Sequence, residues 1–104
     1  MQIGMIGKGF VGTAISEGFK TQGHTTICHD VRLETKIEDV IDTPIVYISV
    51  PTPSAPNGDC DISIVGSVLQ ELSDLNYNGV VCVKSTVKPG SIDGWKEQFD
   101  SLNI

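Results

Sequence analysis

Gly7, Gly9 and Gly12 stand between a short apolar run and an amphipathic stretch of the chain. With the residues between them they fit the pattern G-x-G-x-x-G, in which the first glycine permits a tight turn from a strand into a helix. The second lets a ligand approach the main chain closely, and the third lets the helix pack tightly on its strand. The arrangement is typical of folds in which strands and helices alternate.

Four short apolar runs, rich in β-branched residues, predict strands at residues 2–6, 25–29, 45–50 and 80–84. Their apolar residues follow one another directly instead of alternating with polar ones. This favours strands that are covered on both faces, as in a parallel sheet between helices. The sequence therefore predicts an α/β fold with a small, mainly parallel sheet of about four strands.

The segments between these runs predict helices. Residues 10–21 repeat apolar or small residues at helical spacing, and Gly23 follows as a helix-ending glycine. A second helix is expected after Asp61, a candidate N-cap, and before the turn-forming residues 76–79. A third helix is expected after residues 89–91.

The connection between the second and third predicted strands is short and acidic. Thr35 and Glu38 form a capping-box pattern there, which predicts a helix of about two turns over residues 36–42. A crossover between parallel strands needs roughly 10 to 12 residues, so this connection is just long enough to cross the sheet. The expected order is a strand followed by a helix, four times over.

A glycine turn of this kind is a candidate pyrophosphate site. The free N–H groups at the start of a helix and the helix dipole both favour a negative charge at that position. The candidate cofactor-binding residues are Gly7, Gly9, Phe10, Val11 and Gly12, which form the turn and open the helix.

A dinucleotide site also needs a carboxylate at the end of the second strand, to accept hydrogen bonds from the adenosine ribose. Asp30 stands there, 30 − 12 = 18 residues after Gly12, where the pattern predicts about 20. An acid disfavours a 2′-phosphate and so favours NAD over NADP, and Arg32 is placed to soften that preference. The alternative is that the glycines form a structural turn and that Asp30 is a solvated acid.

The composition and charge of the chain exclude several classes of protein. Its 104 residues predict a single domain over 1–104, and 39% hydrophobic and 19% charged residues are typical of a globular protein. A net charge of 7 − 13 = −6 argues against nucleic-acid or anionic-lipid partners. No apolar run approaches the ~20 residues of a membrane span, so we expect a cytoplasmic protein.

The cysteines and histidines indicate no metal site. Cys28, Cys60 and Cys82 are odd in number and lack a C-x-x-C spacing, which argues against disulfides and zinc. Cys28 and Cys82 lie in apolar runs and are expected to be buried. His24 and His29 have no nearby cluster of acids or cysteines, so neither is a candidate ligand or catalytic group.

Two further loops carry distinctive motifs. The third predicted strand runs into the sequence V-P-T-P-S-A-P-N-G-D-C-D at residues 50–61, and the fourth into K-S-T-V-K-P-G at residues 84–90. With the glycine turn, these motifs resemble the N-terminal NAD-binding domain of the UDP-glucose/GDP-mannose dehydrogenase family, and the likeness covers nearly the whole chain. Members of that family oxidise the C6 hydroxyl of a nucleotide sugar to a carboxylate in two NAD-dependent steps, through a cysteine thiohemiacetal.

The resemblance implies roles for two threonines. Thr52 and Thr86 would lie at the carboxyl ends of adjacent strands, beside the cofactor crevice. Thr86 is similar to the family's threonine near the nicotinamide and the reacting carbon, which makes it an auxiliary catalytic candidate as well as a cofactor-binding one. The alternative is that the prolines of these loops shape turns while both threonines cap main-chain groups.

The chain also departs from the family pattern in two respects. Between Asp30 and the V-P-T-P motif the family normally carries a further helix and strand, so the resemblance predicts a reduced, Rossmann-like three-layer fold with strand order 2-1-3-4. The chain ends at Ile104, before the segments that hold the family's catalytic lysine, asparagine and nucleophilic cysteine. Its own three cysteines lie in other contexts, so the chain alone is not expected to be active.

Three hypotheses follow for function. The first is an NAD-binding domain of a nucleotide-sugar 6-dehydrogenase, without the family's central and C-terminal domains. The second is a reduced, non-enzymatic module, of a phage type for example, that binds a nucleotide or a partner. The third is a chain that complements a separate catalytic polypeptide, and self-association through a surface of its own is a further expectation.

Overall fold

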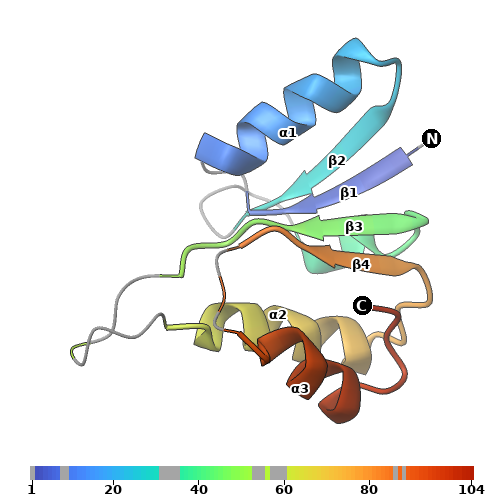
Figure 1. The fold of residues 1–104 in the computed structure, drawn as a ribbon. Helices are drawn as coiled ribbons and strands as arrows, with labels where there is room; N and C mark the ends of the chain where they lie inside the picture. The colour runs from blue at the N-terminus through green and yellow to red at the C-terminus, as the bar shows by residue number, and fades with distance from the viewer. Residues whose placement is uncertain are drawn as a thin grey trace.

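Four parallel strands form the middle layer of the computed structural model, which describes residues 2–7, 10–30, 36–52, 56, 61–85, 87 and 89–104, without the side chains of Phe10 and Val11 (Figure 1). The sheet order is β2-β1-β3-β4, and every neighbouring pair is parallel, which confirms the expected α/β class and strand order. The elements follow in the order β1 (Gln2–Ile6), α1 (Phe10–Thr21), β2 (Thr25–His29), η1 (Ile37–Val40), β3 (Ile45–Ile48), α2 (Ser63–Asp74), β4 (Val80–Val83) and α3 (Ser91–Gln98).

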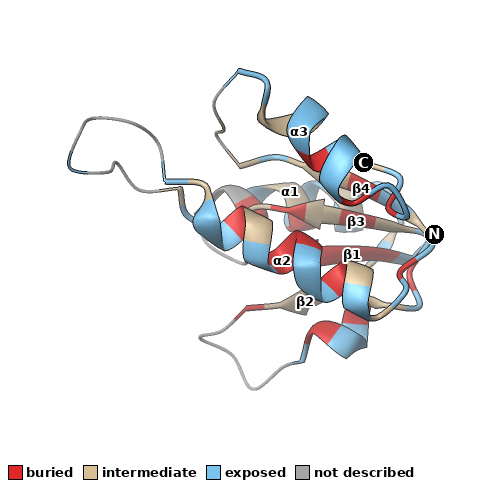
Figure 2. Ribbon diagram, turned by 90° about the horizontal axis from the view of Figure 1, so that it is seen from below, coloured by how far each residue is buried: buried red, intermediate tan, exposed pale blue. Residues whose placement is uncertain are grey.

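Helices lie on both faces of the sheet, which gives the expected three layers (Figures 1 and 2). The helix α1 lies on one face, where the buried Ser16 hydroxyl is 2.9 Å from Oγ1 of Thr26 on β2. On the opposite face lie α2 and α3, together with η1, which packs against β1 and β2. The main hydrophobic core lies there, and its fully buried members include Val40, Val46, Ile48, Val65, Leu69 and Leu72.

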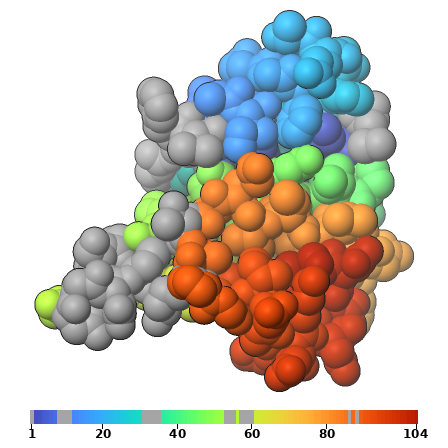
Figure 3. Space-filling view, in the orientation of Figure 1, coloured from blue at the N-terminus to red at the C-terminus, as the bar shows by residue number. Residues whose placement is uncertain are grey.

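The α1 face of the sheet is covered over only half of its width. In β1, Met5 is fully buried beneath α1, but Tyr47 on β3 and Cys82 on β4 are half-buried. Val80, at the start of β4, is 43% exposed, and Figure 3 shows this part of the sheet between α1 in blue and α3 in red. Complete cover of both faces was expected for all four strands. It holds for β1 alone. The edge strand β2 is half-buried, and on the α1 side of β3 Tyr47 stays half-buried although Phe19 of α1 packs against it.

The crossover from β2 to β3 contains a shorter helix than the sequence predicts. The described helical residues are a single 3-10 turn, Ile37–Val40, instead of two α-helical turns over 36–42, and Thr35 lies outside the described residues. In a 3-10 helix the side chains of residues three apart point the same way, so Ile37 and Val40 both reach the core. The buried Thr43 hydroxyl then donates to the Val40 carbonyl at 2.6 Å, which ends the turn.

The other predicted helices are confirmed, with small changes at their ends. The helix α2 begins at Ser63 with Ile62 in the N-cap position, one residue after the predicted cap. Asp61 nevertheless accepts the Ser63 N–H at 3.0 Å through its carboxylate. Asn76, in the predicted turn after α2, has a φ of 57°, and Gly90 before α3 has a φ of 85°.

Candidate functional site

The carboxyl ends of the four strands lie at one edge of the sheet because all the strands are parallel. The chain leaves β1 toward β2 on one side and later returns to β3 on the other side of β1. At this point the Gly7 N–H donates to the His29 carbonyl at 2.7 Å, and the Ser49 N–H donates to the Ile6 carbonyl at 2.8 Å. In open α/β sheets a ligand binds in the crevice at such a reversal of strand order. The candidate site is therefore the edge around Gly7.

Gly7 occupies a position that only glycine fits. Its φ is +90°, a left-handed conformation that L side chains rarely adopt. A Cβ atom there would also overlap the carbonyl oxygen of Ser49, which follows β3. The main chains after β1 and β3 therefore touch at this point, and a side chain would force them apart.

Gly12, the third glycine of the motif, lies in the first turn of α1. A Cβ atom on Gly12 would overlap the Gly7 carbonyl oxygen, so the absence of a side chain lets α1 start directly against the turn. The first turn of α1 contains no acidic residue. The first N–H groups of a helix have no acceptor within the helix, so these groups and the helix dipole favour an anion at this end of α1.

Part of the predicted turn lies outside the described residues, namely Lys8 and Gly9. Phe10 and Val11 are described by their main chain, which forms the start of α1. The close approach of a pyrophosphate at Gly9 stays a prediction.

Asp30 follows β2 directly. Its neighbour His29 accepts the Gly7 N–H, which brings the main chain at the end of β2 close to the glycine turn in space. Asp30 is 7% exposed and takes part in a polar interaction within the protein. Asp30 is therefore not a solvated acid, and its predicted role at the adenosine ribose stays a prediction.

The ends of β3 and β4 lie side by side at the same edge. Thr52, four residues beyond β3, is half-buried, and Thr86 lies outside the described residues. The Lys84 N–H donates to the Ile48 carbonyl at 2.8 Å, so the main chains remain paired up to this point. The predicted roles of both threonines stay predictions.

Ser85 is a site-edge residue that the sequence reasoning missed. Its hydroxyl accepts the Val50 N–H at 2.9 Å and donates to the Val50 carbonyl at 2.8 Å. A serine carries no sign of such a contact in the sequence itself, since Val50 is 35 residues away. The available signal is its place directly before Thr86 in the distinctive loop.

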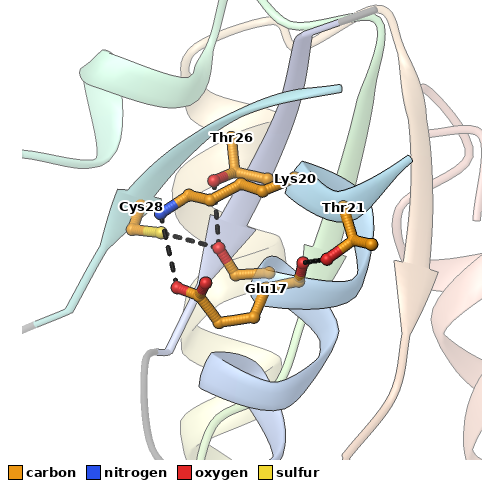
Figure 4. A network of polar contacts seen from close by, with 6 residues as sticks. Glu17, Lys20, Thr21, Thr26 and Cys28 are labelled. Atoms are coloured by element: carbon orange, nitrogen blue, oxygen red, sulfur yellow. Dashed lines mark hydrogen bonds and ion pairs between the residues drawn. The ribbon is translucent and has the colours of Figure 1, made fainter. Parts of the chain in front are cut away.

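The described cysteines lie within strands, each one residue before the strand ends. Cys28 on β2 points toward α1, where its sulfur is 3.9 Å from the Ser16 hydroxyl (Figure 4). Cys28 and Cys82 are free thiols and are half-buried, not buried as expected, because α1 leaves room around them. Within the described residues, no three His, Cys, Asp or Glu side chains are grouped so that they could hold a metal ion.

None of the helices in the described part of the chain is long and apolar enough to cross a membrane.

Comparison with known proteins identifies the family of this fold unit. Residues 31–101 match the model of the UDP-glucose/GDP-mannose dehydrogenase family, NAD binding domain. YtcA of Bacillus subtilis, provisionally named a UDP-glucose 6-dehydrogenase, is 26% identical over a region of 137 residues that includes the whole chain and 32% of that protein. A UDP-glucose 6-dehydrogenase of Rickettsia bellii is 35% identical over 72 residues, which are 64% of the chain and 17% of the relative.

The fold agrees with this match. A solved ternary complex of GDP-mannose dehydrogenase from Pseudomonas aeruginosa superposes with a TM-score of 0.81 at 24% identity, over 99% of the chain and 33% of that structure. The chain thus spans about a third or less of the length of these proteins. The region matched in Bacillus subtilis YtcA exceeds the chain by 137 − 104 = 33 residues.

The match over residues 31–101 covers more than half of the chain, and the family model describes a domain whose cofactor is NAD. The glycine turn, the buried acid after β2 and the parallel sheet are the features by which such domains hold a dinucleotide. This chain belongs to the UDP-glucose/GDP-mannose dehydrogenase family, and it corresponds to the NAD-binding domain of that family.

Proposed function

We propose that residues 1–104 form one NAD-binding unit, which supplies the cofactor half of a nucleotide-sugar 6-dehydrogenase. The observation that carries the proposal is the contact between Gly12 and the Gly7 carbonyl, which seats the start of α1 directly at the crevice between β1 and β3. Bound NAD would accept the hydride from the sugar. The residues of this chain would bind and orient it.

The turn would hold the pyrophosphate, and the end of β2 would hold the adenosine. Gly7, Gly9, Phe10, Val11 and Gly12 would offer main-chain N–H groups at the positive end of the helix dipole. Asp30 would accept the ribose hydroxyls. The position of Asp30 directly after β2 supports this, and the charge of a carboxylate there disfavours the 2′-phosphate of NADP.

Thr52 and Thr86 would flank the nicotinamide side, beyond the pyrophosphate. Each follows a strand whose carboxyl end faces the crevice. A threonine hydroxyl can donate and accept a hydrogen bond without titrating, so Thr86 could hold a hydroxyl or water beside the reacting carbon. The nucleophilic cysteine of the reaction would come from another part of the enzyme, because Cys28 and Cys82 lie within strands facing α1.

The test is a calorimetric titration of the chain with NAD, NADP and S-adenosylmethionine. We expect NAD to bind in preference to NADP. Asp30→Ala should weaken NAD about tenfold, which corresponds to about 1.4 kcal/mol, and should weaken NADP less.

Asp100→Ala is the matched control for the change of charge. Asp100 is exposed, and it precedes Asn103, which pairs with Val80 at the amino end of β4, at the opposite edge of the sheet. Asp100→Ala should leave the affinities for NAD and for NADP unchanged. Equal or absent binding of all three ligands by the unaltered chain would remove the proposal.

A non-enzymatic module is the second candidate, and the single 3-10 turn between β2 and β3 favours it. Such a module would keep the nucleotide site without a catalytic partner. Mixing the chain with a polypeptide that carries the nucleophilic cysteine distinguishes the two: NAD-dependent oxidation of UDP-glucose only in the mixture supports the enzyme. A partner chain and self-association both remain part of this proposal.

The expected location is the cytoplasm. The free thiols of Cys28 and Cys82 support it, because a reducing compartment preserves such thiols.

A further inference from the structure

The Ser85 side chain joins two loops at the site edge. Its hydroxyl accepts the Val50 N–H at 2.9 Å and donates to the Val50 carbonyl at 2.8 Å. One side-chain oxygen thus satisfies both main-chain groups of a residue 35 positions away. A hydroxyl is suited to this because it carries one donor and two acceptor sites.

This contact continues the sheet beyond the point where its ladder ends. The last paired residues of β3 and β4 are Ile48 and Val83. The main-chain N–H groups of Lys84 and Ser85 both donate to the Ile48 carbonyl, at 2.8 and 3.2 Å. This last carbonyl of β3 therefore accepts two hydrogen bonds from the end of β4. Beyond Val50 comes a proline, which has no N–H to offer. The Ser85 hydroxyl therefore takes the place of the next rung.

Both loops are also anchored to the core on either side of this contact. Val50 and Val87 pack against the buried core cluster as partly buried residues. The hydroxyl contact and the two apolar anchors together fix the directions in which the loops leave β3 and β4. Thr52 follows Val50 by two residues, and Thr86 lies between Ser85 and Val87.

The position of the contact determines which part of a ligand it would affect. The glycine turn follows β1 and Asp30 follows β2, whereas Ser85 and Val50 follow β4 and β3 on the other side of β1. A dinucleotide that lies across the crevice with its adenosine at β2 extends its second nucleotide over β3 and β4.

We propose that Ser85 is a positioning residue for the nicotinamide half of the cofactor. It acts through the loop of residues 50–52 and does not itself touch NAD. This inference rests on the proposed NAD site. It adds that selectivity for the whole dinucleotide over its adenosine half depends on one hydroxyl group.

The test compares NAD with ADP, which contains the adenosine and both phosphates but no nicotinamide nucleotide. Affinities are measured calorimetrically for the unaltered chain, Ser85→Ala, Ser85→Thr and Ser101→Ala. Ser85→Ala removes the hydroxyl, Ser85→Thr retains it, and Ser101→Ala removes an exposed hydroxyl that lies 3.5 Å from the hydroxyl of Ser73. Thermal unfolding followed by circular dichroism checks that each variant is folded.

Ser85→Ala should weaken NAD about five- to tenfold, as expected for one lost hydrogen-bonded contact, and leave ADP unchanged. Ser85→Thr should restore NAD binding, and Ser101→Ala should change neither ligand. An unchanged ratio of NAD to ADP affinity in Ser85→Ala overturns the inference, whether both affinities hold or both fall. Failure of the unaltered chain to bind either ligand instead removes the proposed function, and the inference with it.

Discussion

The Tyr77 hydroxyl, in the segment that leads into β4, donates a 2.8 Å hydrogen bond to the main-chain carbonyl of Thr43, which precedes β3. Tyr77 is 2% exposed, and a Cβ atom on Gly79 would overlap its hydroxyl. The segments that lead into β3 and β4 are therefore joined at the amino end of the sheet. Ser85 and Val50 join the segments that leave the same two strands at the carboxyl end. Tyr77→Phe should lower the free energy of unfolding by about 1 kcal/mol, because the Thr43 carbonyl loses its partner. Urea unfolding at neutral pH measures this.

The same tyrosine predicts a loss of stability in alkali. Burial raises the pKa of Tyr77 above its ordinary value of 10.0. Above that value the unfolded chain releases the proton while the folded chain keeps it, so the unfolded state binds fewer protons and stability falls as pH rises. The stability difference between the unaltered chain and Tyr77→Phe should therefore be constant below the ordinary pKa and shrink as the pH rises above about 10. A difference that stays constant above this pH would contradict the prediction.

Two glycines of α1 should respond to alanine in opposite directions. At Gly12 the added Cβ overlaps the Gly7 carbonyl, so Gly12→Ala should cost about 1–3 kcal/mol of stability and weaken NAD. At Gly18 nothing lies within 4 Å of the added Cβ, so Gly18→Ala should stabilise the helix by about 0.5–1 kcal/mol. Chemical denaturation with NAD titration tests both. Equal effects at the two positions would mean that α1 does not start against the turn.

The contact between Ser16 and Thr26 should couple α1 to β2 energetically. Ser16 is fully buried, and its hydroxyl lies 2.9 Å from that of Thr26. A double-mutant cycle with Ser16→Ala and Thr26→Val should give a coupling of about 0.5–1.5 kcal/mol.

The exposed pair in Figure 4 is the control for that cycle. Lys20 and Glu17 are 3.5 Å apart, with side chains 48% and 63% exposed. Solvent screens this pair, so its own cycle should give less than about 0.5 kcal/mol. A larger coupling energy for the exposed pair than for Ser16 and Thr26 would contradict the prediction that the buried contact couples α1 to β2.

Two residues that follow α3, Phe99 and Leu102, belong to the core. Leu102 is 6% exposed, and the next residue, Asn103, accepts the Val81 N–H at 2.8 Å on the outer edge of β4. Leu102→Ala should cost about 2–4 kcal/mol. Ile64→Ala, at a position 40% exposed on α2, should cost less than about 1 kcal/mol. Urea unfolding compares the two variants, and a similar cost at both would show that the terminal segment is not packed.

The local pattern of the chain was enough to predict most of the elements. Strands β1 and β2 and helix α1 have the predicted bounds, because continuous apolar runs and apolar spacing along a helix are set by neighbouring residues. Gly7 and Gly12 were also assigned correctly as the tight turn and the close helix contact. The motif residues Gly9 and Thr86, by contrast, lie outside the described part, so their roles stay predictions.

The tertiary structure decided what depends on residues far apart in the chain. The capping pattern at Thr35 predicted an α-helix, yet the described residues form a 3-10 turn whose Ile37 and Val40 are both buried in the core. The half-covered α1 face results from the direction of each crossover, and the Ser85–Val50 contact joins residues 35 apart. Periodicity reports on a residue and its near neighbours, so the sequence alone could determine the strands, the helices and the glycine turn. Which main-chain groups meet at the edge of the sheet was settled only when β3 and β4 paired.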